Sequence, residues 1–161
     1  MFFLSEQQNS LRREIRDFVE QEISPIAAQL DASGEYPLEI VRKIGQKGFC
    51  SFPFPSALGG AGLGLVESVL FLEEISRGMA SLGLIFCAHM LPCCYTMLNL
   101  VNERQKRDWL IPGIRAEKLL TFAISEPRGG SDAFTVDTIA ERCPEGWLLN
   151  GSKCWITNAG V

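Results

Sequence analysis

The character of the sequence changes at residues 119–132, which read LLTFAISEPRGGSD. A short apolar run comes first, and a cluster of proline, glycine and polar residues follows it. A short apolar run that ends in a turn cluster is typical of a buried strand. Upstream of this stretch apolar residues recur every three or four positions, as they do in helices, whereas downstream they form short β-like segments. The stretch therefore predicts a boundary between a helical part and a β part.

The helical part is predicted to begin with a long amphipathic helix. Ser5 followed by Gln8 fits a capping box, in which each side chain satisfies a backbone N–H of the first turn. One apolar stripe follows at helical spacing, made of Leu11, Ile15, Phe18, Val19, Ile23, Ile26, Ala27 and Leu30. Pro25 interrupts this stripe, so we expect a kink or a shift of the helix there.

Further helices are predicted up to about residue 112. The second lies between Pro37, in its first turn, and Gly48, which favours a stop. Residues 51–64 are rich in proline and glycine and predict a loop, after which a third helix follows. Residues 80–98 are apolar almost all round, which predicts a helix buried in the centre of a bundle. Residues 102–112 predict a short, capped helix that ends in a loop.

The β part is predicted to contain short strands and tight connections. β-branched and apolar residues favour strands over residues 119–125, 134–140, 147–149 and 153–157. The run Cys143-Pro144-Glu145-Gly146 is typical of a hairpin connection. Asn150-Gly151 is the strongest short hairpin signal in the chain, and it predicts that residues 153–157 return as a strand.

Together these elements predict an α+β fold. It consists of an N-terminal all-α helical bundle, residues 1–117, followed by the first strands of a β-barrel-like domain, residues 118–161. A sheet of so few strands has unpaired edges and an uncovered face. The β part is therefore expected to be about half of a larger β structure.

Composition excludes several classes of protein. The chain has 161 residues, with 15 Lys and Arg against 19 Asp and Glu, and its net charge is −4. A hydrophobic content of 47% with 21% charged residues excludes general disorder, and the mild acidity argues against nucleic-acid binding. The most apolar stretch, residues 82–98, is interrupted by polar side chains, so no membrane-spanning helix is predicted. The first residues lack a basic region, and no secretory signal is predicted.

The cysteines predict reduced thiols rather than a metal site. They form no C-x-x-C pair, and the chain has a single histidine, so no zinc ligand set is present. We expect partly buried, reduced thiols in a reducing compartment. The six positions are Cys50, Cys87, Cys93, Cys94, Cys143 and Cys154.

Two segments of the β part carry residues suited to binding. Glycines in residues 125–132 would allow backbone N–H groups to converge on an anion such as a pyrophosphate, although simple turns have the same composition. In residues 153–158, strand alternation would place Trp155 and Thr157 on one face. A planar ring could stack there and accept a hydrogen bond at its edge, while a core tryptophan is the alternative interpretation.

No catalytic base is assigned in this chain. Glu73 and Glu74 lie on a helix whose other face is apolar, which predicts a solvated face. His89 lies in an apolar helix and is expected to be a satisfied core or pocket-lining side chain rather than an acid–base group.

Taken together, the two binding segments resemble the start of the β-domain of the acyl-CoA dehydrogenase family. The family pattern is approximately T-E-P-x-x-G-S-D followed by N-G-x-K-x-W-I-T-N. This chain has SEPRGGSD at 125–132 and NGSKCWITN at 150–158, with Ser125 replacing the usual threonine and keeping its hydroxyl. The loop PSALGGAGLG at 55–64 is also similar to a family loop. The resemblance covers essentially the whole chain but only the first part of a typical member.

The resemblance implies a cofactor and a reaction. Members bind FAD non-covalently and oxidise an acyl-CoA thioester to its 2,3-enoyl-CoA. Trp155 would pack against the isoalloxazine ring, Thr157 would hydrogen-bond near its reactive nitrogen, and Ser131 would contact the pyrophosphate or the CoA substrate. Glu126 would support its loop rather than remove protons. The residues implied to contact the flavin are Phe122, Ile124, Ser125, Ser131, Trp155, Ile156 and Thr157.

The resemblance also implies partners. The family's catalytic Glu lies in a C-terminal helical domain outside this chain, so the chain alone is expected to be incomplete and inactive. A homo- or hetero-oligomer would supply that domain, and an electron-transfer flavoprotein would accept the electrons. Two alternatives stay open, a non-catalytic scaffold subunit of the same fold and an acyl-CoA oxidase-type relative. A cytoplasmic location is expected, or the mitochondrial matrix if the protein is eukaryotic.

Overall fold

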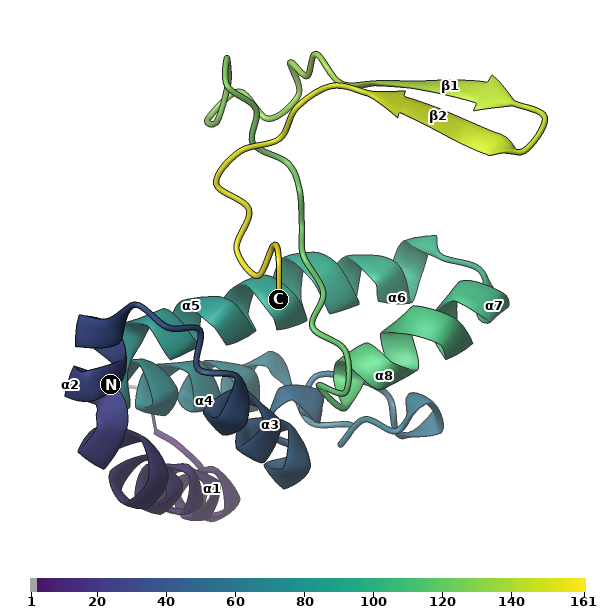
Figure 1. The fold of residues 1–161 in the computed structure, drawn as a ribbon. Coiled ribbons are helices and arrows are strands. Elements are labelled where there is room, and N and C mark those ends of the chain that lie inside the picture. Colours follow the sequence, from purple (N-terminus) through teal and green to yellow (C-terminus); the bar gives the residue numbers. More distant parts are fainter. Residues whose placement is uncertain (1–2) are drawn as a thin grey trace.

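The computed structural model describes residues 3–161, and it shows layered helices with a β-hairpin that stands away from them (Figure 1). The strands are β1 (Ile139–Cys143) and β2 (Gly146–Asn150). π-helical turns at Val19–Ile23, His89–Tyr95 and Lys106–Leu110 join neighbouring helices, and Phe49–Ser51 and Ser56–Leu58 are 3-10 turns. The α-helices are α1 (Glu6–Phe18), α2 (Ser24–Ser33), α3 (Leu38–Lys47), α4 (Leu65–Gly78), α5 (Ala80–Ala88), α6 (Thr96–Leu100), α7 (Glu103–Gln105) and α8 (Ile111–Ile114).

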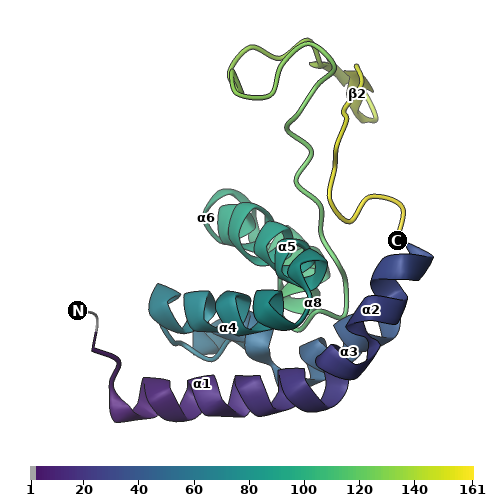
Figure 2. The same cartoon turned by 90° about the vertical axis from the view of Figure 1, so that its left-hand side faces the viewer.

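The start of α1 and the break after it follow the sequence signals. The Ser5 hydroxyl accepts a hydrogen bond from the Gln8 N–H (3.1 Å), and the Gln8 side chain accepts one from the Ser5 N–H (3.0 Å). The predicted capping box is therefore confirmed. The predicted change of direction is also confirmed, because a π-helical turn precedes Pro25, which lies in the first turn of α2. Figure 2 shows α2 rising at an angle from the end of α1.

The centre of the helical part is built from phenylalanine rings. Phe49 contacts Phe18, Phe52 and Phe71, with ring centroids 5.6–5.9 Å apart, and Phe71 contacts Phe86 at 5.6 Å. Edge-to-face and tilted pairs of this kind add to the stabilisation that burial of the rings provides. The rings come from α1, α4, α5 and the turn after α3, so a single cluster joins elements that are distant in sequence.

The helical run from Ala80 to Leu100 is buried along one face only. Leu82, Phe86 and Met90 are buried, whereas Leu84 and Tyr95 are exposed. The prediction of a helix buried all round is therefore wrong. The inward face packs on α4 and the phenylalanine cluster, and the other face lies toward the β part, which leaves much of it open (Figure 1).

This helical run also meets the length and hydropathy of a membrane span. Its mean hydropathy is 1.5 over the most apolar 18-residue window, and 44% of that window is buried inside the protein. The match rests on length and composition alone, and core helices of globular proteins pass the same test. The run here contributes buried side chains to the core, which is the ordinary role of such a helix.

Regular pairing in residues 3–161 is confined to β1 and β2, an antiparallel hairpin in which Ile139 pairs with Asn150 and Cys143 with Gly146. The strands predicted at 119–125 and 153–157 are extended segments rather than strands. One backbone hydrogen bond joins these two segments in the part that the structure describes, from Cys154 N–H to Ser125 C=O (3.0 Å). A strand needs a continuous ladder of such bonds, so the extended conformation alone does not make a sheet here.

The strand predicted at 134–140 begins only at Ile139. The preceding amides bond elsewhere, because the N–H of Thr135 donates to Asp132 C=O and the N–H groups of Asp137 and Thr138 donate to the Glu126 carboxylate. Backbone donors that are used by a turn and a side chain cannot join a sheet ladder. The strand predicted at 147–149 is confirmed within β2.

The hairpin turns where Cys143-Pro144-Glu145-Gly146 predicts, but the second hairpin predicted at Asn150-Gly151 is wrong. Gly151 has a positive φ of 156°, and a Cβ placed on it would lie 2.7 Å from the Cα of Thr138. Glycine is therefore required because two backbone segments approach closely, rather than because the chain reverses.

Candidate functional site

Two extended segments, residues 119–126 and 151–158, run side by side between the helices and the hairpin (Figure 2). The Cys154 N–H donates to Ser125 C=O (3.0 Å), and Lys153 Nζ donates to Ile124 C=O (3.2 Å). Most of the residues predicted to contact a cofactor lie on these two segments. The structure therefore brings both halves of the predicted site together.

Glu126 holds the two segments and the start of the hairpin in one arrangement. Its carboxylate is almost fully buried and accepts hydrogen bonds from Lys153 Nζ (2.6 Å), Thr138 Oγ1 (2.6 Å), and the Asp137 and Thr138 N–H groups. The hydrogen bond from Lys153, followed by those from Thr138 and the Asp137 N–H, lowers the Glu126 pKa to about 2. The carboxylate is thus ionised at neutral pH and supports the loop, in agreement with its predicted role.

Trp155 lies beside this junction and is 92% exposed. Its φ of +57° is in the left-handed region, which a residue within a regular strand does not adopt. The prediction that Trp155 and Thr157 share one face of a strand is therefore wrong. The indole is also not a core side chain, so the alternative interpretation is wrong as well. What the structure shows is an open aromatic side chain on the residue that follows Cys154, whose N–H bonds to Ser125.

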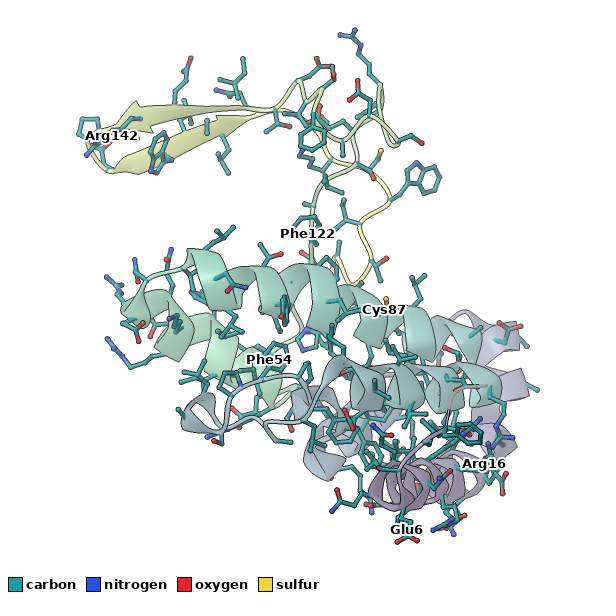
Figure 3. The ribbon with its side chains drawn as sticks, turned by 180° about the vertical axis from the view of Figure 1, so that it is seen from behind. Glu6, Arg16, Phe54, Cys87, Phe122 and Arg142 are labelled. Atoms are coloured by element: carbon teal, nitrogen blue, oxygen red, sulfur yellow. The ribbon has the colours of Figure 1, made fainter. Side chains whose placement is uncertain are left out.

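Phe122 and Thr157 line different cavities. Phe122 lies between the helical layer and the β part (Figure 3) and lines a cavity of about 550 Å³ with Trp109 and residues 158–161 among others. Thr157 lines a smaller cavity of about 340 Å³ that includes Tyr36 and Leu84. Phe122 and Thr157 therefore each border an open space, but the two side chains do not line the same one.

The loop of residues 125–132, which contains Gly129 and Gly130, has only some of its backbone N–H groups free to bind an anion. The Gly129 N–H donates to Glu126 C=O (3.1 Å), and the Glu126 N–H donates back to Gly129 C=O (3.0 Å). A backbone N–H that is used in a turn is not free to bind an anion. A Cβ on Gly130 would meet no atom within 4 Å, and Ser131 beside it is exposed. The loop therefore offers the Ser131 hydroxyl on an open surface.

Glu74 differs from its prediction as a solvated side chain. It is fully buried, and its carboxylate accepts hydrogen bonds from Arg12 (2.7 Å), Arg16 (2.6 Å) and Arg77 (3.1 Å). The hydrogen bond from Arg16, with those from Arg12 and Arg77, lowers the Glu74 pKa to about 2 against the opposing effect of burial. Glu73 beside it is more exposed and contacts Arg12 at 3.2 Å. A carboxylate with three arginine partners joins α1 to α4 and does not act as a base.

His89 is a satisfied core side chain, as predicted. It is fully buried, its Nδ1 accepts a hydrogen bond from the Leu120 N–H (3.1 Å), and its Nε2 lies 2.8 Å from Gly113 C=O. Because Nδ1 accepts, the ring proton is on Nε2 and donates to Gly113. Burial lowers the His89 pKa, so the ring is neutral and fixes the chain between α8 and residue 120.

Three residues that sequence reasoning did not single out hold the site in place. Lys153 bonds to Glu126, and the buried side chain of Asn158 bonds to Tyr36 (3.1 Å) and to the Ile85 C=O (3.1 Å). Lys153 and Asn158 both belong to the NGSKCWITN segment at 150–158, which matches the family pattern. That match could have marked the two residues as important for the site. Tyr36 had no local signal, because its partner lies 122 positions away.

Comparison with known proteins shows that both parts of the chain match described domain families. Residues 5–117 match the family described as "Acyl-CoA dehydrogenase, N-terminal domain", and residues 121–161 match "Acyl-CoA dehydrogenase, middle domain". The mitochondrial short-chain specific acyl-CoA dehydrogenase of Rattus norvegicus is 41% identical over 156 residues, covering 97% of this chain and 38% of the relative.

Solved structures share the fold. One described as the glutaryl-coenzyme A dehydrogenase glutaryl-CoA complex has a TM-score of 0.92 at 37% identity, over 97% of this chain and 40% of that one. The FAD complex of PigA has a TM-score of 0.92 at 26% identity, over 100% of this chain and 43% of that one. The chain thus spans about two-fifths of the length of the proteins it matches. On the match of both domains, this chain belongs to the acyl-CoA dehydrogenase family.

Proposed function

We propose that this chain is the N-terminal portion, or a subunit, of an FAD-dependent acyl-CoA dehydrogenase. In this proposal residues 1–117 are the helical domain and residues 118–161 begin the domain that contacts the flavin. One observation carries the proposal: the hydrogen bonds of Lys153 and Cys154 join the segment that carries the exposed Trp155 to the segment of residues 124–126.

The residues of this region fit a flavin. Trp155 presents an open aromatic face, and Phe122 and Ile124 on the neighbouring segment are each 39% exposed. Exposed aromatic and apolar side chains on these two joined segments are suited to contact with a planar ring. The Ser125 and Thr157 hydroxyls can each donate one hydrogen bond to the polar edge of such a ring.

When bound, FAD would accept the hydride that leaves the β-carbon of the acyl-CoA. Trp155 would pack against the flavin ring and exclude water from that face. Thr157 would donate a hydrogen bond near the reactive nitrogen, and Ile156 would contact the ring between them. Ser131 would bind the pyrophosphate or the CoA. The family resemblance places the base that removes the α-proton outside this chain, and the commitment of Glu74, Glu126 and His89 to other partners is consistent with that.

The proposal extends to substrate, partners and location. A relative with the same fold is described as a glutaryl-CoA complex, which supports an acyl-CoA thioester as substrate. The apolar residues Trp147, Leu148 and Leu149 of β2 are exposed, as expected of a hairpin that a further domain or subunit covers. An electron-transfer flavoprotein would accept the electrons. The protein would act in the cytoplasm or, like the rat relative, in mitochondria.

The test is a titration of the purified chain with FAD, alone and with any protein that co-purifies. We expect bound flavin in the complete assembly and bleaching of its visible absorbance when acyl-CoA is added without oxygen. Trp155→Ala should weaken FAD binding about tenfold, because it removes a stacking surface. Trp147→Ala, which removes another exposed indole, from β2, should leave FAD binding unchanged. A colourless assembly that is inert toward acyl-CoA would overturn the proposal.

A further inference from the structure

The end of the chain is attached to the helices through one buried amide. Residues 155–159 leave the junction with residue 125 and return to the surface of α5 (Figures 1 and 2). Within this segment Asn158 is the one buried residue. Its Nδ2 donates to the Ile85 C=O (3.1 Å), and its Oδ1 accepts from the Tyr36 hydroxyl (3.1 Å).

These two partners leave the Asn158 amide a single orientation. A carbonyl oxygen can only accept, so the amide NH2 must face Ile85. The amide oxygen must then face Tyr36, whose hydroxyl is the donor. Rotating the amide by half a turn would place two oxygens against each other at Ile85. The Tyr36 hydroxyl and the Ile85 carbonyl together therefore fix both ends of the side chain.

The backbone at Asn158 depends on the same anchor. Its φ is +67°, and the Ala159 N–H donates to Ile156 C=O (3.2 Å), so Asn158 lies in a tight turn. Asparagine tolerates the left-handed region better than most residues. Thr157 lies within this turn, directly before Asn158, and Trp155 lies three residues before Asn158. Any displacement of Asn158 is therefore passed to the residues proposed to contact the flavin.

Tyr36 is well placed to act as the fixed end of this connection. It lies in the linker between α2 and α3, directly before Pro37, and its ring packs against the main apolar cluster. Its C=O accepts a hydrogen bond from the Leu38 N–H (2.8 Å). A half-buried ring between two helices moves less than an exposed terminal segment, so the hydroxyl offers a stable reference point.

We propose that Tyr36 is a positioning residue: through Asn158 it sets where Trp155 and Thr157 lie relative to the helices. This inference rests on the proposed function, because the positioned residues are those assigned to the flavin. Tyr36 itself is not assigned a contact with flavin or substrate. Its connection to the site is the hydrogen bond from its hydroxyl to the Asn158 amide oxygen.

The test compares Tyr36→Phe with Tyr95→Phe, which removes the only other tyrosine hydroxyl of the chain. Hydrogen exchange of flavin-free protein, followed by mass spectrometry, reports on residues 155–160. Losing one neutral hydrogen bond should speed exchange there about fivefold in Tyr36→Phe and leave it unchanged in Tyr95→Phe. In an Asn158→Ala background the Tyr36 substitution should have no further effect, since the intermediary is gone.

A second measurement separates positioning from simple anchoring. In the FAD-loaded assembly Tyr36→Phe should weaken FAD binding about threefold to fivefold and shift the visible band of the bound flavin, because the hydrogen bond from Thr157 to the ring edge changes. Unchanged exchange in Tyr36→Phe overturns the inference. Faster exchange with unchanged affinity and an unchanged band also overturns it, because Tyr36 would then hold the segment without positioning the site. If the unsubstituted assembly binds no FAD, the proposed function fails, while the exchange data still decide whether Tyr36 fixes Asn158.

Discussion

At the scale of single residues, the buried carboxylates do most to connect distant parts of the chain. Glu74 on α4 receives two arginines from α1 and one from its own helix, so it joins two helices that share few other polar contacts. Arg16 lies on the side of α1 that faces this cluster (Figure 3). A buried charge with several partners costs little while paired, but loss of one member leaves the others uncompensated.

Glu74→Gln tests this cluster. The substitution keeps the size of the side chain but removes the negative charge among three guanidinium groups. We expect a loss of about 2 kcal/mol in the free energy of unfolding, less than for a fully buried pair because the arginines are partly exposed. Urea unfolding measures the loss. Glu73→Gln, at a more exposed neighbour with one arginine contact, should cost less than about 0.5 kcal/mol, and equal losses in both variants would contradict the role given to Glu74.

The same groups predict how stability depends on pH. Glu74 and Glu126 each have a pKa of about 2 in the folded chain, below the ordinary value of 4.5. The unfolded chain therefore binds protons first, so these carboxylates stabilise the fold above about pH 4.5 and this stabilisation is lost as the pH falls toward 2. Urea unfolding at a series of pH values from 4.5 down to 2 should show a free energy of unfolding that decreases as the pH is lowered. The fall should be shallower in Glu74→Gln, and an identical slope would argue against this assignment.

At the scale of elements, the β part is organised by close contacts around Thr138 rather than by a sheet. The backbone of Gly151 packs closely against Thr138, and the Thr138 hydroxyl donates a hydrogen bond to the Glu126 carboxylate (2.6 Å). The loop, the hairpin and the returning segment therefore meet at one point. A change at this point should disturb all three.

Gly151→Ala is the sharpest test at this scale. A Cβ at residue 151 would overlap the Thr138 backbone, and a positive φ is strained for alanine. We expect limited proteolysis within residues 126–151 to accelerate at least fivefold, which corresponds to about 1 kcal/mol of lost local stability. Gly130→Ala places its Cβ in open space and is the matched control. Equal proteolysis of the two variants would show that the contact with Thr138 is not tight.

Sequence signals were sufficient for the helices and insufficient for the strands, for a physical reason. Capping boxes at Ser5 and Asn102 and the stop at Gly48 depend on neighbours within a few residues, and the structure confirms them. A strand depends on a partner, and the extended segments around Ser125 and Cys154 share one backbone bond in the described residues. The roles of Glu74 and Tyr36 were missed because the α1 arginines that bind Glu74, and the Asn158 partner of Tyr36, lie more than 50 positions away.

At the scale of the whole molecule, stability is unevenly distributed. The helices are packed around two apolar clusters, whereas the hairpin projects away from them and exposes Trp147, Leu148 and Leu149 (Figure 1). Arg142 lies at the far end of this hairpin (Figure 3). An isolated two-stranded hairpin is marginally stable in water. The hairpin is therefore expected to be marginally stable unless a further domain or subunit covers it.

Hydrogen exchange of the purified chain should show this difference. Amides of β1 and β2 should exchange at least about 100-fold faster than those of α4 and α5, because opening the hairpin exposes little buried apolar surface. Addition of a partner that completes the β part should slow exchange in residues 139–150 and leave the helices unchanged. Equal protection of the hairpin and the helices in the chain alone would show that the hairpin is stable by itself.

The phenylalanine core has a practical consequence for optical spectroscopy. The three indoles, Trp109, Trp147 and Trp155, are 50%, 66% and 92% exposed, and the cluster that joins the helices has none of them. Intrinsic emission should therefore resemble that of indole in water even in the native chain, and melting of the helices should change its colour little. The same emission should be quenched when a molecule covers Trp155, so it reports occupancy of the junction rather than folding.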